Sequence, residues 1–262
     1  MASLIQLPEP IPVLRNPFLV MHLGGWSDAG LAGEGAAAFL GARLSTRTIA
    51  AFDPDELLDY RARRPVVRLA NGIIEQLTWS AIELSVAETA GTRDVVMLTG
   101  PEPDFRWQAF TGEVVRACRA LGVTEAFGLG GFPAPSVHTD PVQVLGSSVD
   151  PELAGRLDTV AAVVELSGGV QTVLEQRLYE AGIPATGIWA RIPPYLAGGW
   201  APPDRPLRRA AQSRHRRGGD RVSFWRRDRR RAGALPLPAA PARRRRPGLI
   251  GRFTPVASCR WC

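Results

Sequence analysis

The chain has 262 residues, 45% of them apolar, with 32 basic and 25 acidic side chains and a formal net charge of +7. This length and apolar fraction suffice for one domain with a buried core, with or without an appendage. Every basic residue is Arg, which excludes Schiff-base catalysis and phosphate loops that need Lys. The three cysteines form no disulfide framework, and we find neither a signal peptide nor an apolar run of membrane-spanning length, so we expect a cytoplasmic protein without a membrane partner.

The charge divides the chain into two chemically different parts. Residues 1–200 carry 14 Arg and 22 acidic residues, whereas residues 201–262 carry 18 Arg and 3 acidic residues. We therefore predict an extended lead-in over residues 1–16, a globular α/β domain over residues 17–200 and a basic, Pro-rich tail over residues 201–262.

Apolar runs and helical periodicities alternate along the globular part. Residues 82–87 fit either a strand or a helix. Buried or alternating runs predict strands at residues 18–23, 48–52, 66–69, 73–78, 94–99, 125–129, from 142, 161–166 and 185–190. Helical spacing or capping signals predict helices at residues 28–44, after 53, from 110 to 121, at 151–157 and after 169.

This alternation predicts an α/β fold with helices on both sides of a mixed, largely parallel sheet. Asn71-Gly72 is a strong hairpin signal, and we expect that hairpin to supply the antiparallel part of the sheet. The helix at residues 28–44 presents Leu31, Phe39, Leu40 and Leu44, and its Ala and Gly residues predict tight packing on the sheet.

Three predicted strands end alike, in Gly followed by polar and aromatic residues. The resulting turns span residues 24–30, 100–107 and 130–140. If the strands are parallel, the turns lie at the edge where α/β proteins meet ligands and partners.

The charged residues of these turns have alternative roles. Asp28 suits a helix cap or a catalytic carboxylate. Glu102 and Arg106 either bind a polar ligand or form a local ion pair, and Trp107 fits the core or a subunit contact. His138 is the best general-base candidate, oriented by Asp28 or Glu102, or else fixes its loop by hydrogen bonds.

No complete catalytic set accompanies these residues. The sequence holds no nucleophile elbow, phosphate loop or metal motif, and Cys259 and Cys262 form only half of a zinc-site pattern. We therefore expect no metal and no cofactor, and we favour a protein that is not an enzyme. His22 is interpreted as an ordinary strand residue.

The ordered motifs resemble the proteasome assembly chaperone family, in its bacterial, actinobacterial-type branch. The resemblance covers about residues 13–196. It is carried by residues 23–30 (LGGWSDAG), 52–57 (FDPDEL), 63–65 (RRP), 100–107 (GPEPDFRW), 130–135 (GGFPAP), 138–139 (HT) and 188–193 (IWARIP).

This resemblance implies a three-layer α/β/α fold of the phosphorylase/hydrolase type and a non-enzymatic interaction protein. It implies a homo-oligomer, such as the trimers of bacterial members of that family, with proteasome subunits as partners. The interaction residues that it marks are Gly25, Trp26, Asp28, Asp53, Glu102, Pro103, Arg106, Trp107, His138 and Thr139. The alternative is a hydrolase- or phosphorylase-like enzyme for a small polar ligand, working through His138, Asp28, Glu102 and Arg106.

The tail has two interpretations. Arg-rich sequence with Phe224-Trp225 suits an arm that binds nucleic acid through phosphates and base stacking. Arg, Pro, Ala and Gly are also what a shifted reading frame of GC-rich DNA encodes, and we favour this second interpretation.

Overall fold

The computed structural model describes residues 3–160 and 163–197. Their strands are β1 (Phe18–Gly24), β2 (Arg47–Ala51), β3 (Val66–Ala70), β4 (Ile73–Thr78), β5 (Glu83–Ala87), β6 (Val95–Pro101), β7 (Glu125–Pro133), β8 (Val144–Ser148) and β9 (Ala185–Ile192). Their α-helices are α1 (Ala32–Leu44), α2 (Pro54–Leu57), α3 (Trp107–Ala120), α4 (Pro151–Ala154) and α5 (Val170–Glu180), with short 3-10 turns at Ala29–Leu31 and Pro194–Leu196.

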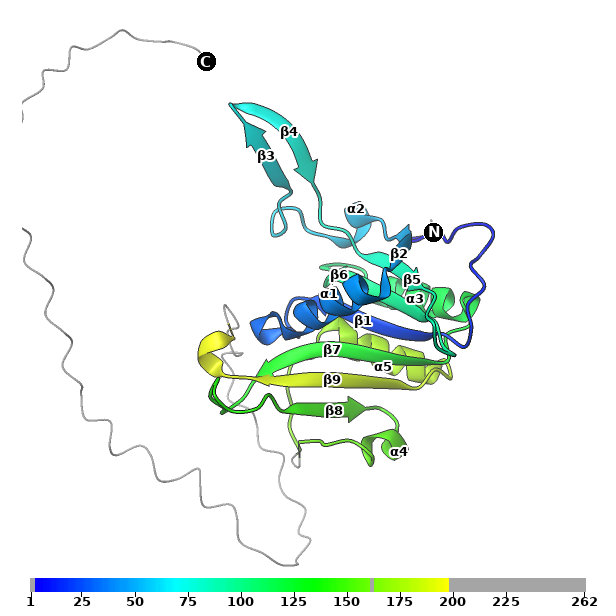
Figure 1. Cartoon of the computed structure of the whole chain (residues 1–262), viewed down its shortest axis with the longest axis vertical. Helices are drawn as coiled ribbons and strands as arrows, with labels where there is room; N and C mark the ends of the chain where they lie inside the picture. The colour runs from blue at the N-terminus through cyan, green and yellow to red at the C-terminus, as the bar shows by residue number, and fades with distance from the viewer. Residues whose placement is uncertain (1–2, 161–162, 198–262) are drawn as a thin grey trace, which may run out of the picture. The chain divides into compact units, whose positions relative to one another are not determined.

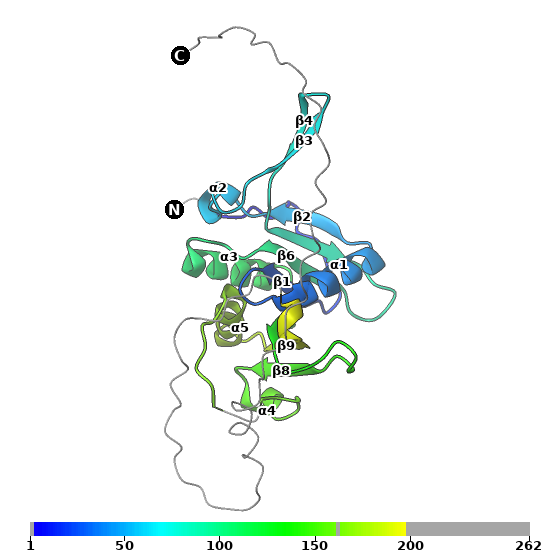
Figure 2. The same cartoon turned by 90° about the vertical axis from the view of Figure 1, so that its left-hand side faces the viewer.

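Seven strands form one mixed sheet in the order β2-β5-β6-β1-β7-β9-β8. The central strands β6, β1, β7 and β9 are parallel, and β2, β5 and β8 join them by antiparallel pairing. Helix α1 lies on one side of the sheet, and α3 and α5 lie on the other (Figure 2). The predicted three-layer α/β/α fold with a mixed sheet is confirmed.

The layer of α3 and α5 covers the main core. Phe110, Val114 and Cys118 lie four residues apart on α3 and are fully buried, as their helical spacing predicts. Burial raises the pKa of the Cys118 thiol to about 12, so this side chain behaves as a small apolar core residue.

Helix α1 packs on the sheet through small residues. Its buried positions are Gly33 and Ala37, whereas Phe39 is 63% exposed and Leu31, which precedes the helix, is 65% exposed. The predicted tight packing is present, but two of the large apolar residues expected on this helix point to solvent.

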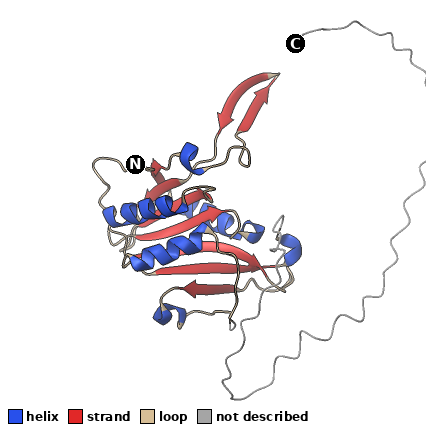
Figure 3. Cartoon of the chain, turned by 180° about the vertical axis from the view of Figure 1, so that it is seen from behind, coloured by secondary structure: helices blue, strands red, loops and turns tan. Residues whose placement is uncertain are grey.

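The β3–β4 hairpin forms at Asn71-Gly72, where both residues have positive φ, as tight hairpin turns require. It is, however, a separate two-stranded sheet that projects away from the seven-stranded sheet (Figures 1 and 3). The expectation that this hairpin makes the main sheet mixed is therefore wrong. The antiparallel strands β2, β5 and β8 do so instead.

Other predicted boundaries shift as well. Residues 82–87 resolve as strand β5, and β7 continues to Pro133, so Gly130 and Gly131 lie inside a strand rather than in a turn. Residues 163–166 have no regular structure, and the tail lies outside the described residues. None of the described helices is long and apolar enough to cross a membrane.

Candidate functional site

The turns that follow β1 and β6 meet the end of β7 at the carboxyl edge of the parallel strands. The Glu102 N–H donates to the Gly24 carbonyl oxygen (2.7 Å), and the Gly131 N–H donates to the Ser27 carbonyl oxygen (3.0 Å). Asp28 forms an isolated parallel bridge to Gly131. The sheet topology thus brings together the strand ends that the sequence predicts to share one edge.

Glycines at this edge are required by close backbone approach. A Cβ at Gly130 would lie 2.6 Å from the Ser27 carbonyl oxygen, and one at Gly131 would lie 2.6 Å from the Ala29 carbonyl oxygen. Any side chain at either position would push the β1–α1 turn away from β7. The Gly-Gly pair therefore fixes this turn against the sheet.

Asp28 holds the start of α1. Its Oδ1 accepts from the Gly33 N–H (2.7 Å), and its Oδ2 accepts from the Glu34 N–H (3.1 Å). Nε2 of His22 lies 3.4 Å from Asp28 Oδ2, and Nδ1 lies 3.3 Å from the Leu129 carbonyl oxygen. The cap interpretation of Asp28 fits this geometry. Sequence reasoning missed His22, whose signal was a polar residue inside a buried apolar strand.

Glu102 holds the start of α5. Its Oε1 accepts from the Val170 N–H at 2.6 Å. A Cβ at Gly169 would lie 2.9 Å from this same oxygen and 2.3 Å from Ser27 Oγ, so only glycine fits between them. Gly25 packs against the other side of Glu102, where a Cβ would lie 3.0 Å from Oε2. The carboxylate thus satisfies an otherwise unpaired helix donor.

Arg106 and Trp107 lie at the start of α3, and their side chains bind groups outside this helix. The Arg106 guanidinium pairs with Glu56 of α2, and Trp107 Nε1 donates to the Pro103 carbonyl oxygen (2.5 Å). The expected local ion pair between Glu102 and Arg106 is therefore wrong, because each side chain is drawn to a different element. Asp53 likewise acts locally and caps α2 by accepting from the Asp55 N–H (3.0 Å).

His138 sits in an exposed loop that is held by Tyr195. The His138 N–H donates to the Tyr195 hydroxyl oxygen (2.8 Å), and Nδ1 lies 2.8 Å from that oxygen. The two rings meet edge to face at 5.9 Å. Thr139 beside it is also exposed. This arrangement fits the loop-fixing role better than that of a general base.

The segment after β9 also touches the β1–α1 turn. A Cβ at Gly30 would lie 2.8 Å from Ile192 Cγ2 and 3.3 Å from the Leu196 carbonyl oxygen. Leu31, the next residue, is therefore a neighbour of the segment that carries Tyr195 and Leu196. We call the exposed side chains along this line the strand-end surface: Leu31, His138, Tyr195 and Leu196. Trp26, whose Nε1 donates to the Ser167 carbonyl oxygen (3.0 Å), lies in the same β1–α1 turn.

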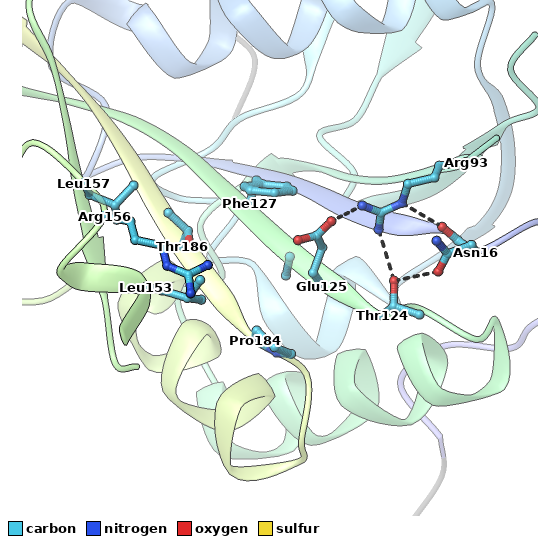
Figure 4. A pocket seen from close by; sticks show the side chains of 11 residues that line it. Asn16, Arg93, Thr124, Glu125, Phe127, Leu153, Arg156, Leu157, Pro184 and Thr186 are labelled. Atoms are coloured by element: carbon cyan, nitrogen blue, oxygen red, sulfur yellow. Dashed lines mark hydrogen bonds and ion pairs between the residues drawn. The ribbon is translucent and has the colours of Figure 1, made fainter. Parts of the chain in front are cut away.

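Of two hollows on the sheet, one of about 770 Å³ opens at this same edge, beside α1. Its lining includes His22, Gly24, Asp28, Leu31 and Gly100 but not Glu102, Arg106 or His138. The other, of about 440 Å³, lies at the amino edge of β7 and β9. There Arg93 is tied to Glu125, to Thr124 Oγ1 and to the Asn16 carbonyl oxygen (Figure 4).

The candidate catalytic residues do not form one constellation. Asp28, Glu102, Arg106 and His138 each engage a different partner from their own chain. Among residues 3–160 and 163–197, no group of three or more His, Cys, Asp or Glu side chains is placed to hold a metal. Nothing in this geometry favours the hydrolase- or phosphorylase-like alternative.

The fold and this edge define a class of protein: a three-layer α/β/α scaffold whose strand-end loops are braced by helix caps. A PAC2 family model matches residues 22–214, and the chain belongs to the PAC2 family. No match to this chain was found among proteins of curated function.

Solved structures of similar sequence support the assignment to the PAC2 family. A PAC2 family protein from Streptomyces avermitilis MA is 34% identical (TM-score 0.63; 69% of this chain and 77% of the other covered). A proteasome-assembly chaperone homologue from Mycobacterium tuberculosis is 32% identical (TM-score 0.65; 69% and 77%). A protein of unknown function from the same organism is also 32% identical (TM-score 0.70; 76% and 71%).

Proposed function

We propose that this chain is a non-enzymatic interaction protein of the proteasome-assembly-chaperone type. In this proposal it self-associates and presents the strand-end surface to proteasome subunits. Membership of the PAC2 family supports a chaperone-like role, as does the 32% identity to a relative described as a proteasome-assembly chaperone homologue.

One observation carries the proposal: the charged side chains of the carboxyl edge are occupied within the chain. Asp28 and Glu102 cap helices, and Arg106 is paired with Glu56. Binding a substrate through them would first uncap a helix or break an ion pair. The large side chains that this edge exposes to solvent are mainly apolar. Leu31, Tyr195 and Leu196 are 65%, 59% and 51% exposed. Exposed apolar side chains on a braced edge suit recognition of a protein surface.

The backbone of Leu31 supports the same role. Its φ is 55°, in the left-handed region that a Leu rarely adopts. The α1 cap and the close approach of Ile192 to Gly30 hold it there. Strain of this kind, held by surrounding structure, is typical of functional surfaces.

Leu31→Asn separates binding from folding. Asn tolerates positive φ, so the turn keeps its conformation while the apolar contact is lost. We expect the full chain to bind purified proteasome α-subunits and the variant to bind about tenfold more weakly, as removal of one partly exposed Leu implies. Surface plasmon resonance on immobilised α-subunits measures both affinities.

Ser45→Asn is the matched control. Ser45 follows the other end of α1 and also has a positive φ, of 51°. We expect this variant to bind like the unmodified chain. Absence of binding by the unmodified chain would refute the proposed client, and equal binding by Leu31→Asn would remove Leu31 from the interface.

A further inference from the structure

The β3–β4 hairpin has one continuous apolar face. Residues opposite each other in an antiparallel pair project to the same side, and the register pairs Val67 with Leu77 and Leu69 with Ile74. These four side chains are 44%, 49%, 62% and 64% exposed, in that order. We call them the arm face. No described residue of the same chain covers them.

A β-bulge keeps charge off the arm face. The register shifts between Arg68 and Leu69, which places Ile74 rather than Glu75 opposite Leu69. Glu75 instead accepts a hydrogen bond from Arg68 Nε (2.9 Å), and Arg68 is paired with Gln76. Without the bulge, regular pairing would put Glu75 among the apolar side chains. The bulge thus keeps the Arg68–Glu75 ion pair off the arm face, while the opposite face also carries Val66 and Ile73.

The base of the hairpin is held by side-chain contacts, although strands β3 and β4 themselves are exposed to solvent. The Tyr60 ring lies 4.7 Å from the Trp79 ring, and its hydroxyl donates to Asp55 Oδ1 (2.5 Å). Asp104 pairs with Arg63 and accepts from the Asp59 N–H (2.8 Å). Five side chains therefore hold the base of the hairpin. Figure 1 shows β3 and β4 extending from this base away from the seven-stranded sheet.

A two-stranded hairpin is only marginally stable in water unless something packs on it. The arm face exposes four large apolar side chains next to one another, and an apolar patch of this size is often a site of protein contact. We propose that the arm face packs on the body of a second copy of this chain. This inference rests on the self-association in the proposed function and names the element that mediates it.

The area requires reciprocal contacts. Four large apolar side chains expose on the order of 400 Å² at about 100 Å² each, so one arm and the surface that it covers bury roughly 800 Å². Stable interfaces bury about 1,200–2,000 Å² in total. A two-fold pair in which each copy both donates an arm and receives one has two such contacts and buries roughly 1,600 Å² in total.

Size-exclusion chromatography with light scattering on the full chain tests this. We expect the unmodified protein to be an oligomer, with a mass at least twice the 28.3 kDa of one chain. Leu69→Asp combined with Ile74→Asp places two carboxylates on the arm face and should yield monomers. The matched control is Val66→Asp with Ile73→Asp, on the opposite face with 70% and 67% exposure, and it should remain oligomeric.

Circular dichroism establishes that each variant is folded. If the double Asp variant does not fold, Val67→Ser with Leu77→Ser gives a milder change, for which we expect at least a tenfold larger dissociation constant of the oligomer. An unmodified monomer would overturn both the arm and the proposed self-association. An oligomer that survives the arm-face changes, or that both double variants disrupt equally, would overturn the arm alone. Neither result bears on α-subunit binding through Leu31.

Discussion

At the residue scale, Glu175 is the least expected feature of the core. It lies on the buried side of α5, 3% exposed, where its carboxyl oxygen accepts from Gln171 Nε2 (3.2 Å). Burial raises the pKa of this carboxyl group to about 7. Gln171 Oε1 is buried without a hydrogen-bond donor, while Gln171 Nε2 donates to the Glu175 carboxyl group. Burial thus favours the neutral form of Glu175 beside the Gln171 amide.

Glu175→Gln should therefore stabilise the protein at neutral and higher pH. The folded state keeps the carboxyl proton to about pH 7, whereas the unfolded chain releases it near pH 4.5. The unmodified protein thus loses stability as pH rises through this range. An amide carries no charge to bury, so we expect Glu175→Gln to raise the free energy of unfolding at pH 8 by roughly 1–3 kcal/mol. Urea denaturation at pH 8 and pH 4.5 measures it. A gain of equal size at both pH values would contradict this origin.

At the element scale, the β1–α1 turn depends on contact with β7. Gly131→Ala should cost about 1–3 kcal/mol, because its Cβ would lie 2.6 Å from the Ala29 carbonyl oxygen. Gly35→Ala is the matched control: it lies within α1 with nothing within 4 Å of the added Cβ, and it should stabilise by about 0.5–1 kcal/mol. Thermal unfolding of both variants compares them. A neutral Gly131→Ala would mean that the turn can move without cost.

The helix caps at this edge show how far sequence reasoning reaches at this scale. The strand–turn–helix order predicts Asp28 before α1, and the cap follows from local chemistry. Glu102 caps α5, which begins 68 residues later in the chain. No local pattern predicts that partner, because the fold alone brings β6 beside the start of α5.

At the scale of the whole molecule, two buried carboxyl groups oppose each other in pH dependence. Side-chain and backbone hydrogen bonds from Arg15 hold the pKa of Asp94 well below its usual range. This contribution is complete above the unfolded pKa near 3.8 and is lost as pH falls below it. The contribution of Glu175 is lost as pH rises from 4.5 to about 7.

Unfolding free energy should therefore peak at mildly acidic pH, at about pH 4.5–5.5. Urea titrations across pH 3–9 measure this profile. In Glu175→Gln the fall above the maximum should flatten, whereas the acid limb should remain. A profile that rises steadily to pH 8 in the unmodified protein would contradict the assignment.

The sequence by itself determined the class of fold, the turns after β1 and β6, the helix at α3 and the hairpin. Each follows from short-range causes: apolar spacing, Gly and Pro positions, and side chains that cap the next helix. It also determined the family resemblance, which the PAC2 match confirms. The domain boundary at residue 200 stays a prediction.

Only the tertiary structure decided how those parts are used. It pairs Arg106 with Glu56 rather than Glu102, places His22 beside Asp28, and leaves Leu31 and Phe39 exposed. It also sets the β3–β4 hairpin apart from the main sheet. Apolar spacing identifies an amphipathic element but not the surface that covers it, because burial depends on which distant segments the fold brings alongside.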